Sequence, residues 1–196
     1  MRPAKNIDLQ MKEFLNSIYK VDEHILESYL AHCKPYSVPK KTIMTAPGEI
    51  ERYWYFVLEG IQKSYYQEEE KQHIIAFTYP PSFSGIPESI FSQTPSRYYL
   101  ETLTDSRFLR ISYEKHEQLM VEHREIETLF RKATEFFLVG LLERYYELMA
   151  FDIETRFRTF VKRSPHLLGV ISQKDLASYL RIDSTNFSKL MNSIRI

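Results

Sequence analysis

The stretch ISQKDLASYLRIDSTNFSKLMNSI, residues 171–194, decides the fold, and it predicts two short helices joined by a tight turn. Ser172 can cap the first helix, with Asp175 three residues further on, as in a capping box. Apolar residues then share one face of this helix: Leu176, Ala177 and Leu180. Because Ala177 is small, a second helix can cross the first one closely, as in a helix-turn-helix.

The second helix is expected from Ser184 to about Ile194, with Asp183 as its cap. Its apolar stripe follows the helical spacing i, i+3, i+4, i+7: Phe187, Leu190, Met191 and Ile194. The opposite face carries hydroxyls, an amide and one cation, which can reach phosphates and base edges in a major groove. We assign Thr185, Ser188 and Lys189 to base edges, and Ser184, Asn192 and Lys174 to the DNA backbone.

Arg181 stands in the turn at a position that often holds glycine. A left-handed backbone costs a non-glycine residue roughly 1 kcal/mol, so a different or strained turn is expected. The pattern alone also fits a plain C-terminal αα-hairpin.

The charge of the chain is unevenly distributed, although its net charge is zero. Residues 156–196 contain eight Lys or Arg and two Asp or Glu, which gives +6, and the remaining 18 and 24 give −6. A basic C-terminal fifth is the electrostatic footprint of a protein that binds a polyanion.

The 196 residues suit one large or two small domains. No apolar run approaches 18 residues, so no membrane helix is expected, and the N-terminus lacks the apolar segment of a secretion signal. We therefore expect a cytoplasmic protein. Cys33 is the only cysteine, which excludes an internal disulfide. The six histidines show no ligand spacing, so neither a metal nor a cofactor is expected.

Upstream, residues 8–32 predict two short helices. From Tyr36 to Ser112, short runs rich in β-branched and aromatic residues alternate with Pro and Gly, which is typical of a sandwich or barrel. The run YWYFVLEG, residues 53–60, looks like a strand that enters a hairpin at Gly60.

The helical period returns at Tyr113 and persists to about Met149. Residues 136–142, FFLVGLL, are apolar almost all round, so this helix needs two partners. One can be the β-domain and the other the same helix of a second subunit; burial within one chain is the alternative. The expected interface residues are Ile126, Phe130, Ala133, Phe137, Gly140 and Leu141. Asp152 can cap a further helix that runs to about Arg163.

This order of elements resembles the Crp/Fnr family of bacterial transcription regulators. The resemblance rests on Gly60 in YFVLEG, Gly85, Ile111-Ser112-Tyr113, Phe151-Asp152 and the motif SQKDLASYL…STNFSKL. It implies an α+β fold: an antiparallel β-roll (a jelly roll of the cyclic-nucleotide-binding type) over residues 1–121, a long dimerisation helix over 122–150, and a helix-turn-helix domain, here without an evident wing, over 151–196. It also implies a homodimer on two operator half-sites of double-stranded DNA, an effector pocket, and RNA polymerase as a further partner.

The effector segment departs from the cAMP-binding members of the family. Counted without gaps from Ile111, the positions of their polar partners hold Ile86, Ser96, Leu141 and Leu142, and Pro87 removes an N–H donor. Glu88 and Arg97 lie one or two positions away and could serve only if the loop were shifted. With Gly85, these residues mark the expected pocket. Three alternatives are open: the pocket is empty, it is filled by side chains, or it takes a ligand less polar than cAMP.

Three functions are compatible with these features. The leading hypothesis is a dimeric, sequence-specific DNA-binding regulator that is not an enzyme. The second is a β-roll that senses a small molecule, with a helical tail that contacts protein instead of DNA. The third, a cupin-type metalloenzyme, needs clustered ligands on facing strands, where His73 is the only histidine.

Overall fold

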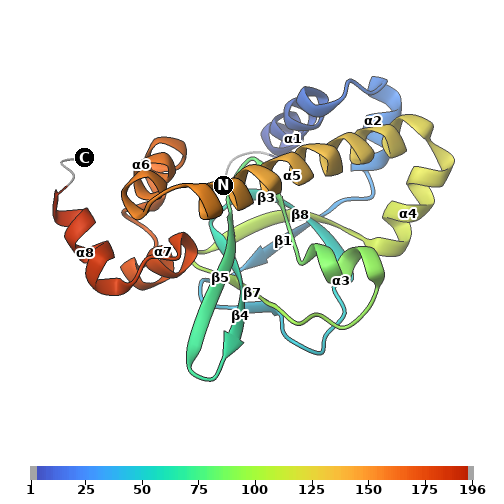
Figure 1. Cartoon of the computed structure of the whole chain (residues 1–196). Coiled ribbons are helices and arrows are strands. Elements are labelled where there is room, and N and C mark those ends of the chain that lie inside the picture. Colours follow the sequence, from blue (N-terminus) through green and yellow to red (C-terminus); the bar gives the residue numbers. More distant parts are fainter. Residues whose placement is uncertain (1–3, 194–196) are drawn as a thin grey trace. The chain divides into compact units, whose positions relative to one another are not determined.

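The computed structural model describes residues 4–193. Figure 1 shows helices at both ends of the chain and strands between them. The first part of the chain contains α1 (Ala4–Ile18), α2 (Glu23–Leu30), β1 (Lys34–Val38), β2 (Ile43–Thr45), β3 (Tyr53–Glu59), β4 (Gln62–Glu68), β5 (Lys71–Thr78), β6 (Ser82–Ser84), α3 (Pro87–Ser92), β7 (Tyr99–Thr102) and β8 (Ser106–Ser112). The helices that follow are α4 (Tyr113–Glu122), α5 (Arg124–Ala150), α6 (Ile153–Arg163), a 3-10 turn (Pro165–Leu167), α7 (Gln173–Leu180) and α8 (Ser184–Ser193).

The eight strands form the antiparallel jelly roll that the resemblance implied, where the strand pattern alone predicted a sandwich or barrel. One sheet has the order β1-β8-β3-β6 and the other β2-β7-β4-β5. In the first sheet, β3 pairs with β8 from Tyr53 opposite Ser112 to Val57 opposite Phe108. The sequence-distant strands β1 and β8 also pair, so the ends of the roll are held together.

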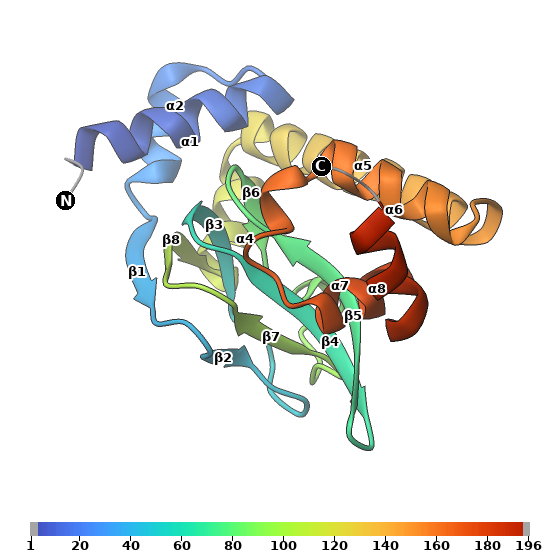
Figure 2. The ribbon, with the colours of Figure 1, turned by 90° about the vertical axis from the view of Figure 1, so that its left-hand side faces the viewer.

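Side chains alternate between the two faces of β3 and β8, as strand geometry requires. Tyr55, Val57 and Phe108 pack together on one face. Phe56 and Leu109 point to the other face, where they join the core that α1, α2, α4 and the first turns of α5 complete. Figure 2 shows α1 and α2 beside the start of α5.

Gly60 makes the turn between β3 and β4, as expected for the hairpin. Its φ is +93°, which favours glycine. A Cβ added there would lie 2.6 Å from the Asp105 carbonyl oxygen, so the close approach of that backbone also requires glycine.

The helical region after Tyr113 is divided at His123, whose backbone is extended with φ −128° and ψ 104°. The sequence predicted one continuous helical period here, because neither Pro nor Gly marks the break. The long helix α5 therefore begins at Arg124.

The chain forms two compact units. The first comprises residues 1–64 and 77–136, and the second comprises residues 65–76 and 137–196. The boundary thus falls inside α5, and the tip of the β4–β5 hairpin belongs to the second unit. There, the Ser178 hydroxyl of α7 donates to the Gln72 carbonyl over 2.9 Å and accepts the Ile74 N–H over 3.1 Å.

The helices that the structure describes include none with the length and apolar character needed to cross a bilayer.

Candidate nucleic-acid interface and effector segment

The two-helix unit of α7 and α8 has the caps that the sequence predicted. The Ser172 hydroxyl accepts the Asp175 N–H over 3.1 Å, and the Asp183 carboxylate accepts the Asn186 N–H over 2.9 Å. That N–H lowers the pKa of Asp183, because it stabilises the charged carboxylate. Arg181 ends α7 in the left-handed region, with φ 55° and ψ 42°. The turn therefore takes the geometry usual for glycine, with an arginine in that position.

The apolar stripe of this unit faces inward. Leu176, Ala177, Leu180 and Phe187 are buried, and the Phe187 ring meets the edge of Phe157 from α6 at 5.6 Å between centroids. Leu190 and Met191 are half-buried. Ile194, predicted to complete the stripe, lies outside the described residues.

The opposite face of the unit is exposed. It carries every residue that the sequence assigned to DNA: Lys174 on α7, and Ser184, Thr185, Ser188, Lys189 and Asn192 on α8. Hydroxyls, an amide and two cations thus share a surface without an acidic residue among the six.

Arginines from two other helices hold the end of α7, which the sequence did not predict. The Arg144 guanidinium of α5 stacks on the Tyr179 ring at 3.9 Å and donates to the Tyr179 carbonyl oxygen. Arg156 of α6 donates to the Leu180 carbonyl over 2.8 Å. These cations satisfy carbonyls that the end of a helix leaves free. The sequence gives no signal for these contacts, because Arg156 lies 24 residues before Leu180 and Arg144 lies 35 residues before Tyr179.

The C-terminal half of α5 exposes large apolar side chains on its surface: Phe136, Phe137, Leu138, Val139, Leu141, Leu142, Tyr145, Tyr146 and Met149. Gly140 lies among them, and a Cβ added there would meet open space. The other expected interface residues are placed differently. Ala133 is half-buried, whereas Ile126 and Phe130 belong to the core of the first unit.

The segment between β6 and β7 holds the expected effector residues of the first unit. Ile86 precedes α3 and is buried, and Pro87 occupies the first turn of that helix. The Ser89 hydroxyl accepts the Glu51 N–H over 2.9 Å and donates to the Thr94 carbonyl over 2.6 Å. These bonds fix α3 against the loop before β3.

The polar groups of this segment are engaged with one another. The Ser96 hydroxyl donates to the Tyr98 carbonyl over 2.8 Å. The exposed Arg97 guanidinium pairs with the Glu88 carboxylate over 2.8 Å. Gly85, just before Ile86, has φ +150°. Leu141 and Leu142, the remaining expected pocket residues, belong to the second unit and are exposed.

Metal-ligand geometry is not found in the described part of the chain: no three His, Cys, Asp or Glu side chains there are grouped to hold an ion. His73 of β5 stacks on Tyr66 at 4.5 Å between ring centroids. His116 of α4 is buried, and its Nδ1 lies 2.9 Å from the Tyr29 hydroxyl.

The roll, with α3 and α4, matches the model of a known family. Residues 35–123 match the model of the cyclic nucleotide-binding domain, from the first strand to the break before α5. This part of the chain is thus similar to cyclic nucleotide-binding domains. No curated protein matches the chain.

Solved structures resemble the chain beyond this domain. FixK2 from Bradyrhizobium japonicum has 20% sequence identity and a TM-score of 0.70, over 82% of this chain and 83% of that one. A CooA mutant from Carboxydothermus hydrogenoformans has 18% identity and a TM-score of 0.67, over 91% and 82%. The c-di-GMP responsive regulator CLP from Xanthomonas campestris has 19% identity and a TM-score of 0.65, over 87% and 90%. The likeness to these three structures extends over the roll and the helices that follow it, so the expected fold is confirmed.

Proposed function

We propose that the protein is a cytoplasmic transcription regulator that binds double-stranded DNA sequence-specifically as a homodimer. The observation that carries this proposal is the exposed polar face of α8 on a two-helix unit whose apolar face is buried. A helix with short polar side chains and one lysine on its free side suits a major groove.

The position along α8 divides the roles of these residues. Side chains near the start of a recognition helix reach the bases first. We therefore assign Thr185, Ser188 and Lys189 to base edges, with Lys189 preferring guanine. The remaining three residues, Lys174, Ser184 and Asn192, contact phosphates, where the net charge of +6 over residues 156–196 favours binding.

The dimer follows from the exposed C-terminal half of α5. An apolar surface of this kind on one helix is unfavourable in water and marks an interaction site. A second copy would supply the second recognition helix for a two-fold operator.

The effector of the cyclic nucleotide-binding domain is proposed to be a molecule other than cAMP. A phosphate needs a cation or several donors, because an unpaired buried charge is costly. At the counted positions stand the buried Ile86 and Ser96, whose hydroxyl is bonded to the Tyr98 carbonyl. The nearby Arg97 is paired with Glu88.

Two lysine variants test the proposal after an operator has been selected from a genomic library. Lys189→Ala should relax the preference at one base pair per half-site by about 1–3 kcal/mol. Lys174→Ala should weaken binding to all sequences equally and lower the salt slope by about one. Both are measured by titration of the operator and its single-base variants over a salt series. An unchanged base preference in Lys189→Ala would remove α8 from the groove and favour a tail that contacts protein.

A further inference from the structure

A cavity of about 390 Å³ lies in the first unit, between α1 and the strands β3 and β6. Small-molecule sites begin at about 300 Å³, so this cavity can hold a compact organic ligand. All of its lining residues lie between positions 10 and 82 and belong to the same compact unit. The cavity is therefore separate from the segment of Ile86 to Arg97 described above.

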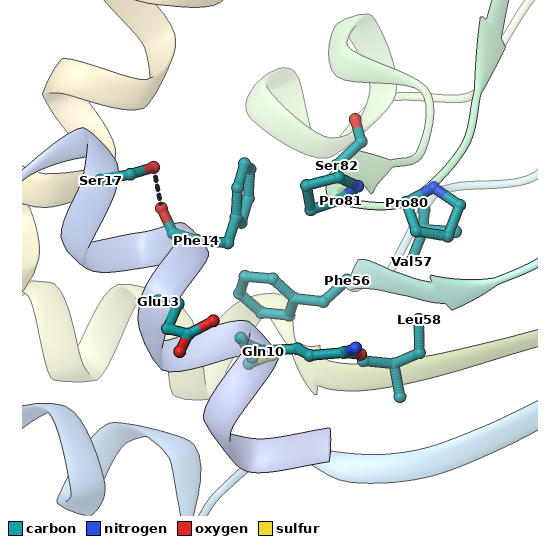
Figure 3. Close-up of a pocket in the computed structure, with 11 residues that line it drawn as sticks. Gln10, Glu13, Phe14, Ser17, Phe56, Val57, Leu58, Pro80, Pro81 and Ser82 are labelled. Carbon is teal, nitrogen blue, oxygen red and sulfur yellow. Dashed lines mark hydrogen bonds between the residues drawn. The ribbon is translucent and has the colours of Figure 1, made fainter. Parts of the chain in front are cut away.

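The wall of the cavity is mainly apolar. Phe14 projects from α1, Phe56 and Leu58 from β3, and Pro80 and Pro81 precede β6 (Figure 3). The aromatic part of the wall is firmly held: the Phe83 ring lies 5.6 Å from Phe14 and 4.7 Å from Phe56, between centroids. A rigid apolar wall of this kind favours an aromatic or branched aliphatic body.

The polar side chains at the cavity determine which ligand charge it favours. The hydroxyl of Ser17 is already bonded to the Phe14 carbonyl, as Figure 3 shows, and that of Ser82 to the Phe83 carbonyl. Glu13 and Gln10 extend from α1 at the cavity, and both residues are exposed. No lysine or arginine is among the described residues that line the cavity.

We propose that this cavity binds a small organic cation: an amine with an aromatic or branched apolar body, whose ammonium group pairs with the Glu13 carboxylate. The apolar body takes the place of water on Phe14 and Leu58, which are half-buried. The carboxylate selects a cation at the rim, and the described lining residues offer phosphates and carboxylates no basic partner. The site goes beyond the proposed function, because its occupation requires neither DNA nor a second copy.

Calorimetry on the full chain tests the site with three probes that share a phenyl ring: 2-phenylethylamine, 2-phenylethanol and 3-phenylpropanoate. We expect the amine to bind about twofold to fivefold more tightly than the alcohol, and the anion least tightly. Absence of amine binding at roughly 10 mM, or equal binding of amine and alcohol, would overturn the proposal.

Three variants locate the binding. Glu13→Gln keeps the shape of the side chain and should abolish the preference of the amine over the alcohol. Glu114→Gln removes an exposed carboxylate from α4 and should leave that preference unchanged. Gln10→Trp places a large side chain at the cavity from an exposed position and should weaken both probes. A preference that persists in Glu13→Gln would place the amine elsewhere, whatever the outcome of the operator titrations.

Discussion

The two halves of α5 carry similar apolar residues in opposite environments. In the first half, Ile126 and Leu129 are fully buried at 0% exposure. In the second half, Phe137 is 53% and Leu142 is 58% exposed. The composition of a helix therefore does not determine whether its apolar residues are buried in the core. The elements packed against it decide, and the first half shares a core with α1, α2 and the first sheet.

This difference separates two contributions to the stability of the protein. Apolar residues of the first half stabilise the fold of one chain, because they leave water when that chain folds. Those of the second half gain the same free energy only when another surface covers them. The predictions below distinguish the two halves, beginning with the largest effect.

Leu129→Ala should lower the free energy of unfolding by about 2–5 kcal/mol, because it leaves a cavity in the core of the first unit. The matched change in the second half, Leu142→Ala, should cost less than about 0.5 kcal/mol. Both are measured by urea unfolding in the Phe137→Glu background, so that association does not contribute. Equal costs at the two positions would mean that the halves do not differ as described.

His116 packs against the first half of α5 and should make the stability of this core depend on pH. Its ring meets the Phe130 ring edge-on at 4.4 Å between centroids, and burial lowers the pKa of His116 from 6.5 to about 4. Between these values the unfolded chain binds a proton that the folded chain excludes. Stability is full above pH 6.5 and falls as the pH drops to about 4, by about 3 kcal/mol, since one pKa unit is about 1.4 kcal/mol.

The control is His116→Gln, which can still bond the Tyr29 hydroxyl but does not titrate. Urea unfolding at pH 7.5 and pH 4.5 should show a smaller pH dependence in this variant than in the wild type. If both proteins lose the same stability on acidification, carboxyl groups elsewhere account for the effect and His116 does not.

A smaller effect is expected in the unit that carries the second half of α5. Arg181→Gly should stabilise α7 and α8 by about 1 kcal/mol, because glycine adopts the left-handed backbone without penalty. Amide exchange should slow in residues 173–193 and stay unchanged in residues 124–136. Lys41→Gly removes the cost of the same left-handed geometry in the roll, where the φ of Lys41 is 61°. This variant should slow amide exchange in the roll instead. If either variant slowed amide exchange equally in both units, the two units would not be stabilised independently.

The sequence predicted what depends on near neighbours in the chain. The caps at Ser172 and Asp183 follow from residue types within four positions of one another. At Arg181 a different or strained turn was expected, and the backbone there is left-handed. Strand composition predicted a sandwich or barrel, and the resemblance in the order of elements implied the jelly roll.

Long-range contacts could not be predicted in this way. Helical periodicity shows which residues share a face but not what covers it, so Ile126 and Phe130 were grouped with Phe137 although they lie in the core. The same reason hid the contact of Arg144 with Tyr179 and the pairing of Glu88 with Arg97. The cavity beside α1 depends on residues up to 72 positions apart, from Gln10 to Ser82.

The mass of the protein in solution tests most directly whether the exposed half of α5 faces a second copy. Sedimentation at micromolar concentration should give a dimer for the wild type and a folded monomer for Phe137→Glu, which buries a charge in the interface. Val121→Glu, at an exposed apolar position on α4, should remain a dimer. A monomeric wild type, or a Phe137→Glu dimer of unchanged affinity, would contradict the account.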